Sequence, residues 1–254
     1  MSMSSPPWIF VFLAVAAFGA GAMNALAGGG SFITFPALLL TGLDPRAANI
    51  TSTIALFPGQ VTTGIAGRRY VAGTSQLGFR ALAGISLVGG VVGALLLLAT
   101  PAAFFARLVP WLVLFATGVF AWGSFGNRKM GDASARLGRV GSALAQFAIS
   151  IYGGYFGGGI GFLMLAALTL AGMQLRPAAA TKNVLAAVMN ASAVVVFVFS
   201  RDVYWIEAAV VAVAAIGGGQ LGAWLLSRVN ERKLRIGVVA IGVLLTIGLF
   251  WRAA

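Results

Sequence analysis

A succession of long apolar runs, each bounded by glycine, proline or charged residues, constrains the fold of this chain more than any other feature. Most runs approach the ~20 residues that cross a bilayer as a helix. They cover 8–27, 31–43, 47–66, 77–99, 103–122, 140–156, 160–173, 178–199, 205–226 and 234–251. The runs 31–43 and 160–173 are short, and each follows a glycine cluster. The pattern predicts an all-α integral membrane protein with glycine-broken short helices.

The scarcity of charge supports this interpretation. Of the 254 residues, 60% are hydrophobic and 9% are charged, whereas soluble domains have about 25% charged residues. A soluble fold would leave much of its surface without polar cover, so the apolar excess must face lipid. We expect a single transmembrane domain over 1–254. No Lys or Arg precedes Trp8, so we interpret the first run as a retained helix and not as a cleaved signal peptide.

The chain also repeats itself at a distance of about 130 residues. Matched pairs are Gly28 and Gly158, Gly29 and Gly159, Gly42 and Gly172, Arg46 and Arg176, and Thr51 and Thr181. A Gly-Gly-x-x-Gly-Ala block beginning at Gly89 recurs at Gly218, and small residues at this spacing are typical of close helix packing. We therefore predict two repeats of about five helical segments, 8–122 and 140–251, joined by a basic linker, 123–139.

The distribution of charge predicts the orientation. One side of the membrane would collect Arg68, Arg69, Arg128, Lys129, Arg136, Arg139, Arg176, Arg228, Arg232, Lys233 and Arg235. The other would hold Arg46, Arg201 and Arg252, partly offset by Asp44, Asp202 and Glu207. The positive-inside rule then predicts an inner-membrane protein with both termini outside the cytoplasm. Five segments per half make the repeats inverted, whether the short segments cross or re-enter.

The glycine breaks are the best candidates for a binding site. Unpaired backbone inside a membrane is tolerated only where it is buried in protein or lines a polar cavity. Helices that start at such breaks present free N–H groups, which suit an anion. Close helix packing is the alternative role for these glycines, but their recurrence beside short segments in both halves favours a transporter site.

Polar residues near the breaks, and at matched positions of the following helices, complete the candidate site. Lys182 lies inside an apolar run, where it either attracts an anion or extends to the headgroups. Hydroxyl and amide groups can bind an oxyanion without a permanent charge. The predicted substrate-binding residues are Asn24, Gly28, Gly29, Gly30, Ser31, Thr51, Ser52, Tyr152, Tyr155, Gly157, Gly158, Gly159, Thr181, Lys182 and Asn183.

Several function classes lack the residues they need. The sequence has no cysteine and no histidine, and it contains no nucleotide-binding loop or paired-carboxylate motif. We therefore expect no enzyme activity, no cofactor and no metal. The net charge of +12 is interpreted as Lys and Arg retained on the cytoplasmic side, and not as a nucleic-acid surface. The expected partners are a small anion and the lipid bilayer, and no oligomeric state is indicated.

The block Gly28-Gly29-Gly30-Ser31, continuing through Pro36 and Gly42-Leu43-Asp44-Pro45-Arg46 to Thr51-Ser52, resembles the sulfite exporter TauE/SafE family. The stretch from Gly157-Gly158-Gly159 to Gly172 and Thr181 is similar to that family's second copy. It departs from the pattern at Leu175-Arg176-Pro177 and at Lys182, where Ser is usual. The resemblance implies a multi-pass permease for sulfite, sulfonates or related organosulfur anions, often outward. A channel-like passive anion pathway is the alternative.

Overall fold

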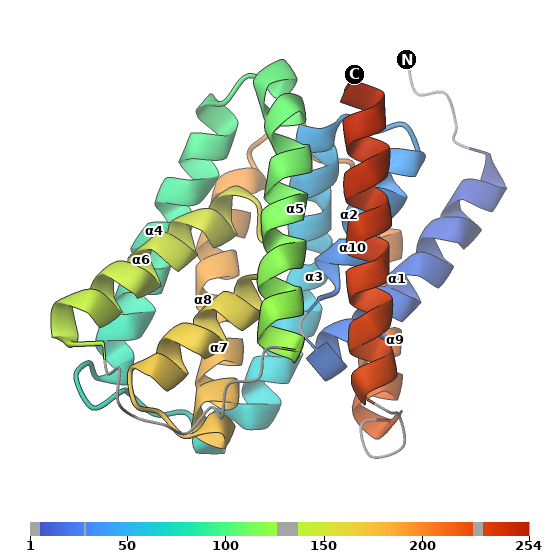
Figure 1. The fold of residues 1–254 in the computed structure, drawn as a ribbon. Helices are drawn as coiled ribbons and strands as arrows, with labels where there is room; N and C mark the ends of the chain where they lie inside the picture. Colours follow the sequence, from blue (N-terminus) through green and yellow to red (C-terminus); the bar gives the residue numbers. More distant parts are fainter. Residues whose placement is uncertain (1–5, 28, 126–136, 226–230, 254) are drawn as a thin grey trace.

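The computed structural model describes residues 6–27, 29–125, 137–225 and 231–253, which form helices and short loops with no strand among them (Figure 1). The elements are α1 (Pro7–Ala27), α2 (Ser31–Leu40), α3 (Pro45–Gly67), the 3₁₀ helix η1 (Arg68–Tyr70), α4 (Phe79–Ala99), α5 (Ala102–Phe125), α6 (Arg139–Tyr155), α7 (Ile160–Leu170), α8 (Leu175–Phe197), α9 (Trp205–Leu225) and α10 (Glu231–Ala253). The all-α prediction is confirmed, and each predicted apolar run overlaps one α-helix, although several helices extend past the ends of their runs.

Local sequence signals set the ends of the short helices. Helix α2 ends before Gly42 and α7 ends before Gly172, and these glycines have φ angles of 95° and 89°. Side chains rarely adopt this left-handed region, so glycine is the natural residue there. The next helix, α3, starts at Pro45, and the carboxylate of Asp44 accepts hydrogen bonds from the backbone N–H groups of Arg46 and Ala47.

Each short helix folds back beside its predecessor instead of continuing across the molecule. The N–H of Leu137, just before α6, donates to the carbonyl of Leu170 at the end of α7, at 3.1 Å. Figure 1 shows that α1 and α2 also begin and end at one end of the molecule, the end that holds both chain termini. The hairpins α1–α2 and α6–α7 open toward opposite ends. Each short helix therefore forms a hairpin with the helix before it, and the inverted repeats stay a prediction.

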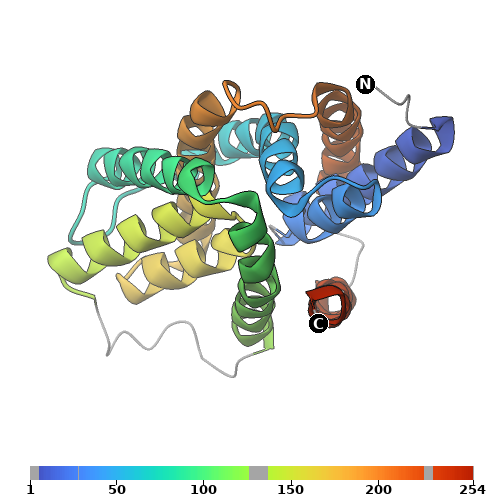
Figure 2. The ribbon, with the colours of Figure 1, turned by 90° about the horizontal axis from the view of Figure 1, so that it is seen from above.

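Helices of the first half pack mainly against helices of the second half. Helix α1 lies along α9 and α6 lies along α4, while α3 packs on α8 and α5 on α10 (Figure 2). Glycines make the closest approaches: a Cβ added to Gly218 of α9 would lie 1.9 Å from the carbonyl oxygen of Phe18. A Cβ added to Gly93 of α4 would lie 2.1 Å from that of Ile151. The predicted packing role of the Gly-Gly-x-x-Gly-Ala blocks is confirmed at these positions.

We expect Gly93→Val to destabilise the fold strongly, because the new side chain would meet the backbone of α6, which cannot move aside like a flexible side chain. Overpacking of this kind costs about 3 kcal/mol. The measurement is the fraction of detergent-solubilised protein that stays monodisperse after heating. Gly84→Val on the same helix is the matched control, because no atom lies within 4 Å of a Cβ added there. Equal losses in both variants would contradict the packing role.

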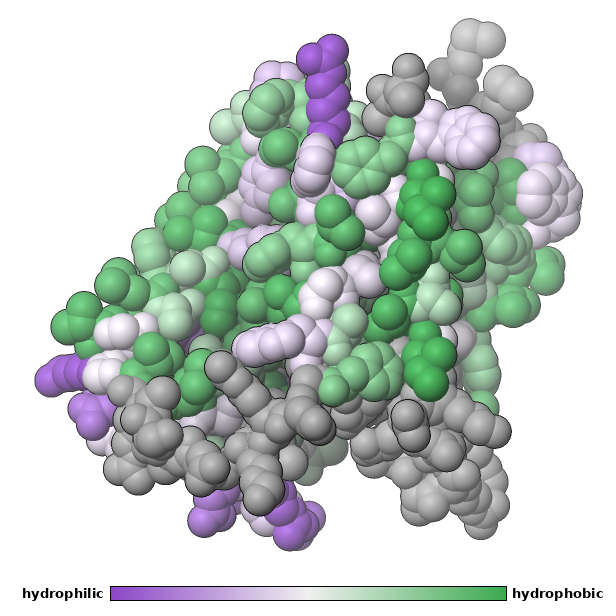
Figure 3. Space-filling model, viewed as in Figure 1, coloured by the Kyte–Doolittle hydropathy of each residue, from purple (hydrophilic) through white to green (hydrophobic). Residues whose placement is uncertain are grey.

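Four helices in the described ranges are long and apolar enough to cross a membrane. These spans are Pro7–Asn24, Phe79–Ala99, Ala102–Trp122 and Arg176–Phe197. Figure 3 shows apolar side chains over the middle of one face, with hydrophilic residues toward its two ends. This division into an apolar belt and polar ends is typical of a protein that spans a bilayer.

Arginines gather at the end toward which α6–α7 opens, which we call the basic end. Arg68, Arg69, Arg80, Arg139 and Arg176 are exposed there, at the ends of helices that Figure 1 shows reaching this end. Asp44, Asp202 and Glu207 lie at the opposite end, near the chain termini. The exposed Arg107, in the first turns of α5, also lies at that opposite end. The orientation predicted from the sequence did not include this residue.

Candidate functional site

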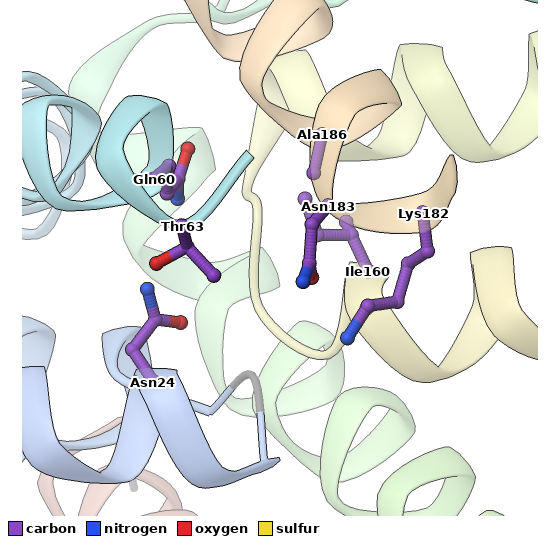
Figure 4. Close-up of a pocket in the computed structure, with 8 residues that line it drawn as sticks. Asn24, Gln60, Thr63, Ile160, Lys182, Asn183 and Ala186 are labelled. Atoms are coloured by element: carbon purple, nitrogen blue, oxygen red, sulfur yellow. The ribbon is translucent and has the colours of Figure 1, made fainter. Parts of the chain in front are cut away.

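A small cavity of about 40 Å³ lies where helices α1, α3, α7 and α8 meet (Figure 4). It is lined by Asn24, Gln60, Thr63, Ile160, Gly161, Lys182, Asn183 and Ala186. Figure 4 shows Asn24 and Thr63 on one side of it, with Asn183 and Lys182 on the other. Thr63 is one turn from the end of α3 and Lys182 two turns from the start of α8, so the cavity lies toward the basic end.

The start of α7 forms one wall of this cavity. Gly157 and Gly159 have positive φ angles of 78° and 74°, and Gly159 occupies the N-cap position. This turn brings Ile160 and Gly161, the first residues of α7, to the cavity. The first N–H groups of a helix have no partner within it, and they carry the positive end of the helix dipole. The second glycine break therefore turns a helix N-terminus toward the cavity.

Lys182 supplies a full positive charge to the same space. Its side chain is partly buried, and no described residue forms a hydrogen bond or ion pair with its ammonium group. No carboxylate is among the residues that line the cavity. Figure 4 shows the amine extending toward Ile160 and the start of α7. A cation without a counterion among the described residues, set beside a helix N-terminus, is a suitable environment for an anion.

Amide side chains add neutral donors to the cavity. The side-chain carbonyl of Gln60 accepts a hydrogen bond from the Nδ2 amide of Asn190, so its own NH₂ group stays available. The hydroxyl of Thr63 donates to the carbonyl of Gly59 at 2.8 Å and can still accept. Asn24 and Asn183 bring two further amides. The ammonium, the amide NH₂ groups and the first N–H groups of α7 therefore give the cavity more hydrogen-bond donors than acceptors, which again favours an anionic ligand.

The structure brings Asn24, Lys182 and Asn183 of the predicted site together, but it places the two matched threonines elsewhere. The Thr51 hydroxyl accepts from the N–H of Tyr204 at 3.2 Å. The Thr181 hydroxyl accepts from the N–H of Ala72 at 3.0 Å and donates to its carbonyl at 3.1 Å. Both threonines are fully buried and hold the loops that lead into α9 and α4. Neither is among the cavity-lining residues.

The described part of the first glycine break, Gly29 and Gly30, is closely packed. The hydroxyls of Ser52 and Thr34 form a buried hydrogen bond of 2.6 Å between α3 and α2. Gly29 and Gly30 are also buried, and a Cβ at Gly30 would lie 2.9 Å from the carbonyl oxygen of Ala20. Ser31 begins α2 and does not line the cavity. The predicted residue Gly28 lies outside the described residues.

The two predicted tyrosines also lie away from the cavity. The hydroxyl of Tyr155 donates to Oγ1 of Thr100 at 3.4 Å, and its backbone carbonyl accepts from the side chain of Asn49 at 3.0 Å. The ring of Tyr152 packs against Phe115, with 5.5 Å between ring centroids. Its buried hydroxyl has no hydrogen-bond partner among the described residues. Gly157, Gly158 and Gly159 shape the turn before Ile160 without lining the cavity themselves.

The site prediction missed Gln60, Thr63, Ile160, Gly161 and Ala186. One signal could have found Gln60. It lies 130 positions before Asn190, the same offset that relates the matched glycines, so the repeat pairs the two amides. They also touch in the structure, at the contact between α3 and α8.

Comparison with known proteins gives one family and several relatives. The model of the family described as "Sulfite exporter TauE/SafE" matches residues 13–249. A "Probable membrane transporter protein" of Haemophilus influenzae is 30% identical over 237 residues, covering 90% of this chain and 89% of that protein. "Probable membrane transporter protein ORF9" of a Sinorhizobium species is 32% identical over 253 residues, covering 95% and 92%. "Probable membrane transporter protein YfcA" of Escherichia coli is 28% identical over 254 residues, covering 98% and 92%. No solved structure matches the chain.

Proposed function

Because the chain belongs to the sulfite exporter TauE/SafE family of membrane transporters, we propose that it is a secondary transporter that exports a small sulfur-containing anion, such as sulfite or an organosulfonate. The single observation that supports an anionic substrate is Lys182, whose ammonium group has no described counterion in the cavity. Amides from three helices and the N-terminus of α7 surround it. Sulfite and sulfonate oxygens are acceptors that these donors can bind.

An alternating-access carrier fits the structure better than a channel. The cavity lies toward the basic end, between residues of α1 and α3 on one side and residues of α7 and α8 on the other. At the end opposite the basic end, Arg46 forms an ion pair of 2.8 Å with Asp202 and donates to the carbonyl of Thr100 at 3.0 Å. A cavity toward one end, with an ion pair between segments at the other end, is the arrangement expected of an alternating-access carrier in a state that is closed on one side.

Flux through purified protein in liposomes tests this function. We expect sulfite or sulfoacetate efflux that saturates with concentration and accelerates when the same anion is present outside. The substrate should leave chemically unchanged, as for a transporter without enzyme activity. Flux that rises linearly with anion concentration and shows no acceleration would indicate a channel and not a carrier. Flux no faster than in empty liposomes, for every sulfur anion tried, would overturn the proposed substrate class.

We also propose that the basic end faces the cytoplasm of the cell that bears this inner-membrane protein, with both termini outside. The chain has no cysteine, so single cysteines can report on orientation without background. We expect a membrane-impermeant maleimide to label Arg107→Cys in intact spheroplasts and Arg80→Cys only after permeabilisation. Both arginines are exposed and lie near helix starts at opposite ends, so each is the control for the other. The reverse labelling would overturn the orientation.

A further inference from the structure

The basic end carries a second hollow, separate from the cavity around Lys182. It lies where α3 passes into η1, has a volume of about 580 Å³, and is lined by Ile65, Ala66, Arg68 and Arg69. Its side of α3 can be assigned from the packing, since Cβ atoms added to Gly64 and Gly67 would touch Val184 and Ala180 of α8. At about 100° per residue, Ile65 and Ala66 therefore lie on the faces that turn away from α8 and from the cavity.

The apolar part of this hollow faces outward. The side chain of Ile65 is 55% exposed, and Ala66 is exposed beside it. Both belong to the last turn of α3, beside the basic end, so their exposed apolar surface is available for contact with lipid acyl chains. Arg69 follows Ile65 by four residues, which places its guanidinium about one turn further toward the membrane surface. The lining of the hollow thus changes from apolar to cationic over about one helical turn.

The cationic part has no counterion among the described residues. Arg68 and Arg69 are exposed, and the only ion pair in the described part of the chain is Arg46–Asp202, at the opposite end. A third arginine is close by: the guanidinium of Arg176 lies 4.3 Å from the ring centroid of Tyr70 and donates to its hydroxyl at 2.9 Å. The guanidinium of Arg69 lies 5.9 Å from the same centroid. Two guanidinium groups beside one ring, with Arg68 next to Arg69 in the chain, repel one another unless an anion neutralises them.

We propose that this hollow binds the phosphate of an anionic phospholipid, with Arg68 and Arg69 as phosphate ligands and Ile65 in contact with the acyl chains. Guanidinium groups bind phosphate oxygens with paired, charge-assisted hydrogen bonds. Basic pockets on the cytoplasmic side of membrane helices bind such headgroups. The apolar rim distinguishes a lipid from free phosphate, because Ile65 and Ala66 gain from contact with acyl chains alone.

Lipid binding to the purified full-length protein tests the proposal. Native mass spectrometry, with cardiolipin or phosphatidylglycerol titrated into the detergent-solubilised protein, gives the affinity. We expect the double variant Arg68→Gln with Arg69→Gln to bind about 30-fold more weakly, since each arginine near an anionic headgroup contributes roughly fivefold. Phosphatidylcholine should bind weakly to both proteins, and glycerol phosphate should not compete at concentrations similar to those of the lipid.

Arg80→Gln is the matched control, because Arg80 is an exposed arginine at the same basic end but lies outside the hollow. It should retain the affinity of the unchanged protein. An equal loss in Arg80→Gln would show a diffuse electrostatic effect and overturn the site, as would equal binding of phosphatidylcholine. Competition by glycerol phosphate would assign the arginines to a soluble phosphate instead. Sulfur-anion flux is not part of the readout, so failure here leaves the transport proposal standing.

Discussion

Lys182→Met strongly weakens saturable sulfite transport while leaving the protein as stable as before, or more stable. The ammonium group has no described counterion and lies inside a membrane-spanning helix, so its removal relieves a cost of burial instead of breaking a bond. Binding loses a charge-assisted interaction, and the apparent affinity for the anion should fall by about 10- to 100-fold. Liposome flux measures the first effect and thermal unfolding in detergent measures the second.

The combination of lost transport with retained stability separates a binding role from a structural one. Lys182→Arg keeps the charge and should retain part of the transport, with a changed preference among anions because the guanidinium is larger and planar. Arg80→Gln removes one positive charge at the basic end without touching the cavity, and it should transport normally. Normal affinity in Lys182→Met would remove the basis for the proposed anion site.

Gln60→Leu both destabilises the protein and impairs transport, and Asn190→Leu added to it restores only the stability. Gln60 accepts the hydrogen bond of the Asn190 side chain, which is buried. The single change leaves that amide without its partner, at a cost of about 1–3 kcal/mol, whereas replacing both amides is nearly neutral. Transport stays low in the double variant because the cavity has lost the Gln60 donor.

Thermal unfolding and liposome flux on the two variants check this pair of effects. Asn190 does not line the cavity, so its role is to hold Gln60 and not to touch the anion. Recovery of transport together with stability in the double variant would show that Gln60 acts only through packing. Ala186→Ser, a small change on the same cavity wall, is the control for general disturbance and should alter flux less than Gln60→Leu.

Residues at matched positions of the two repeats differ in type and in environment, and this difference places a positive charge at the candidate site. Ser52 and Lys182 correspond at the repeat offset of 130 residues, yet one bonds to Thr34 in closed packing and the other lines a cavity. Thr51 and Thr181, which also correspond, both hold loops through backbone hydrogen bonds. Repetition at matched positions therefore identified equivalent structural roles more reliably than it identified binding residues.

The sequence by itself determined the features that depend on neighbouring residues. Apolar runs predicted the helices, although the runs 31–43 and 160–173 extended past Gly42 and Gly172. The short helices end before these glycines because a left-handed turn needs glycine wherever the rest of the chain lies. The packing role of Gly93 and Gly218 was also readable, since small residues at this spacing suit close helix contact. These signals are local, so no knowledge of the partner helix was required.

Only the tertiary structure decided which polar residues share the cavity. Asn24, Gln60, Gly161 and Lys182 come from four helices, and the face that each helix presents is set by its packing against the other half. A rotation of α3 by a single residue position, about 100°, would replace Gln60 with Gly59 or Val61 at the cavity without changing its hydrophobic pattern greatly. Each helix is nearly uniformly apolar around its circumference, so the sequence does not indicate which face lines the cavity. Side-chain contacts between the two halves determine that face.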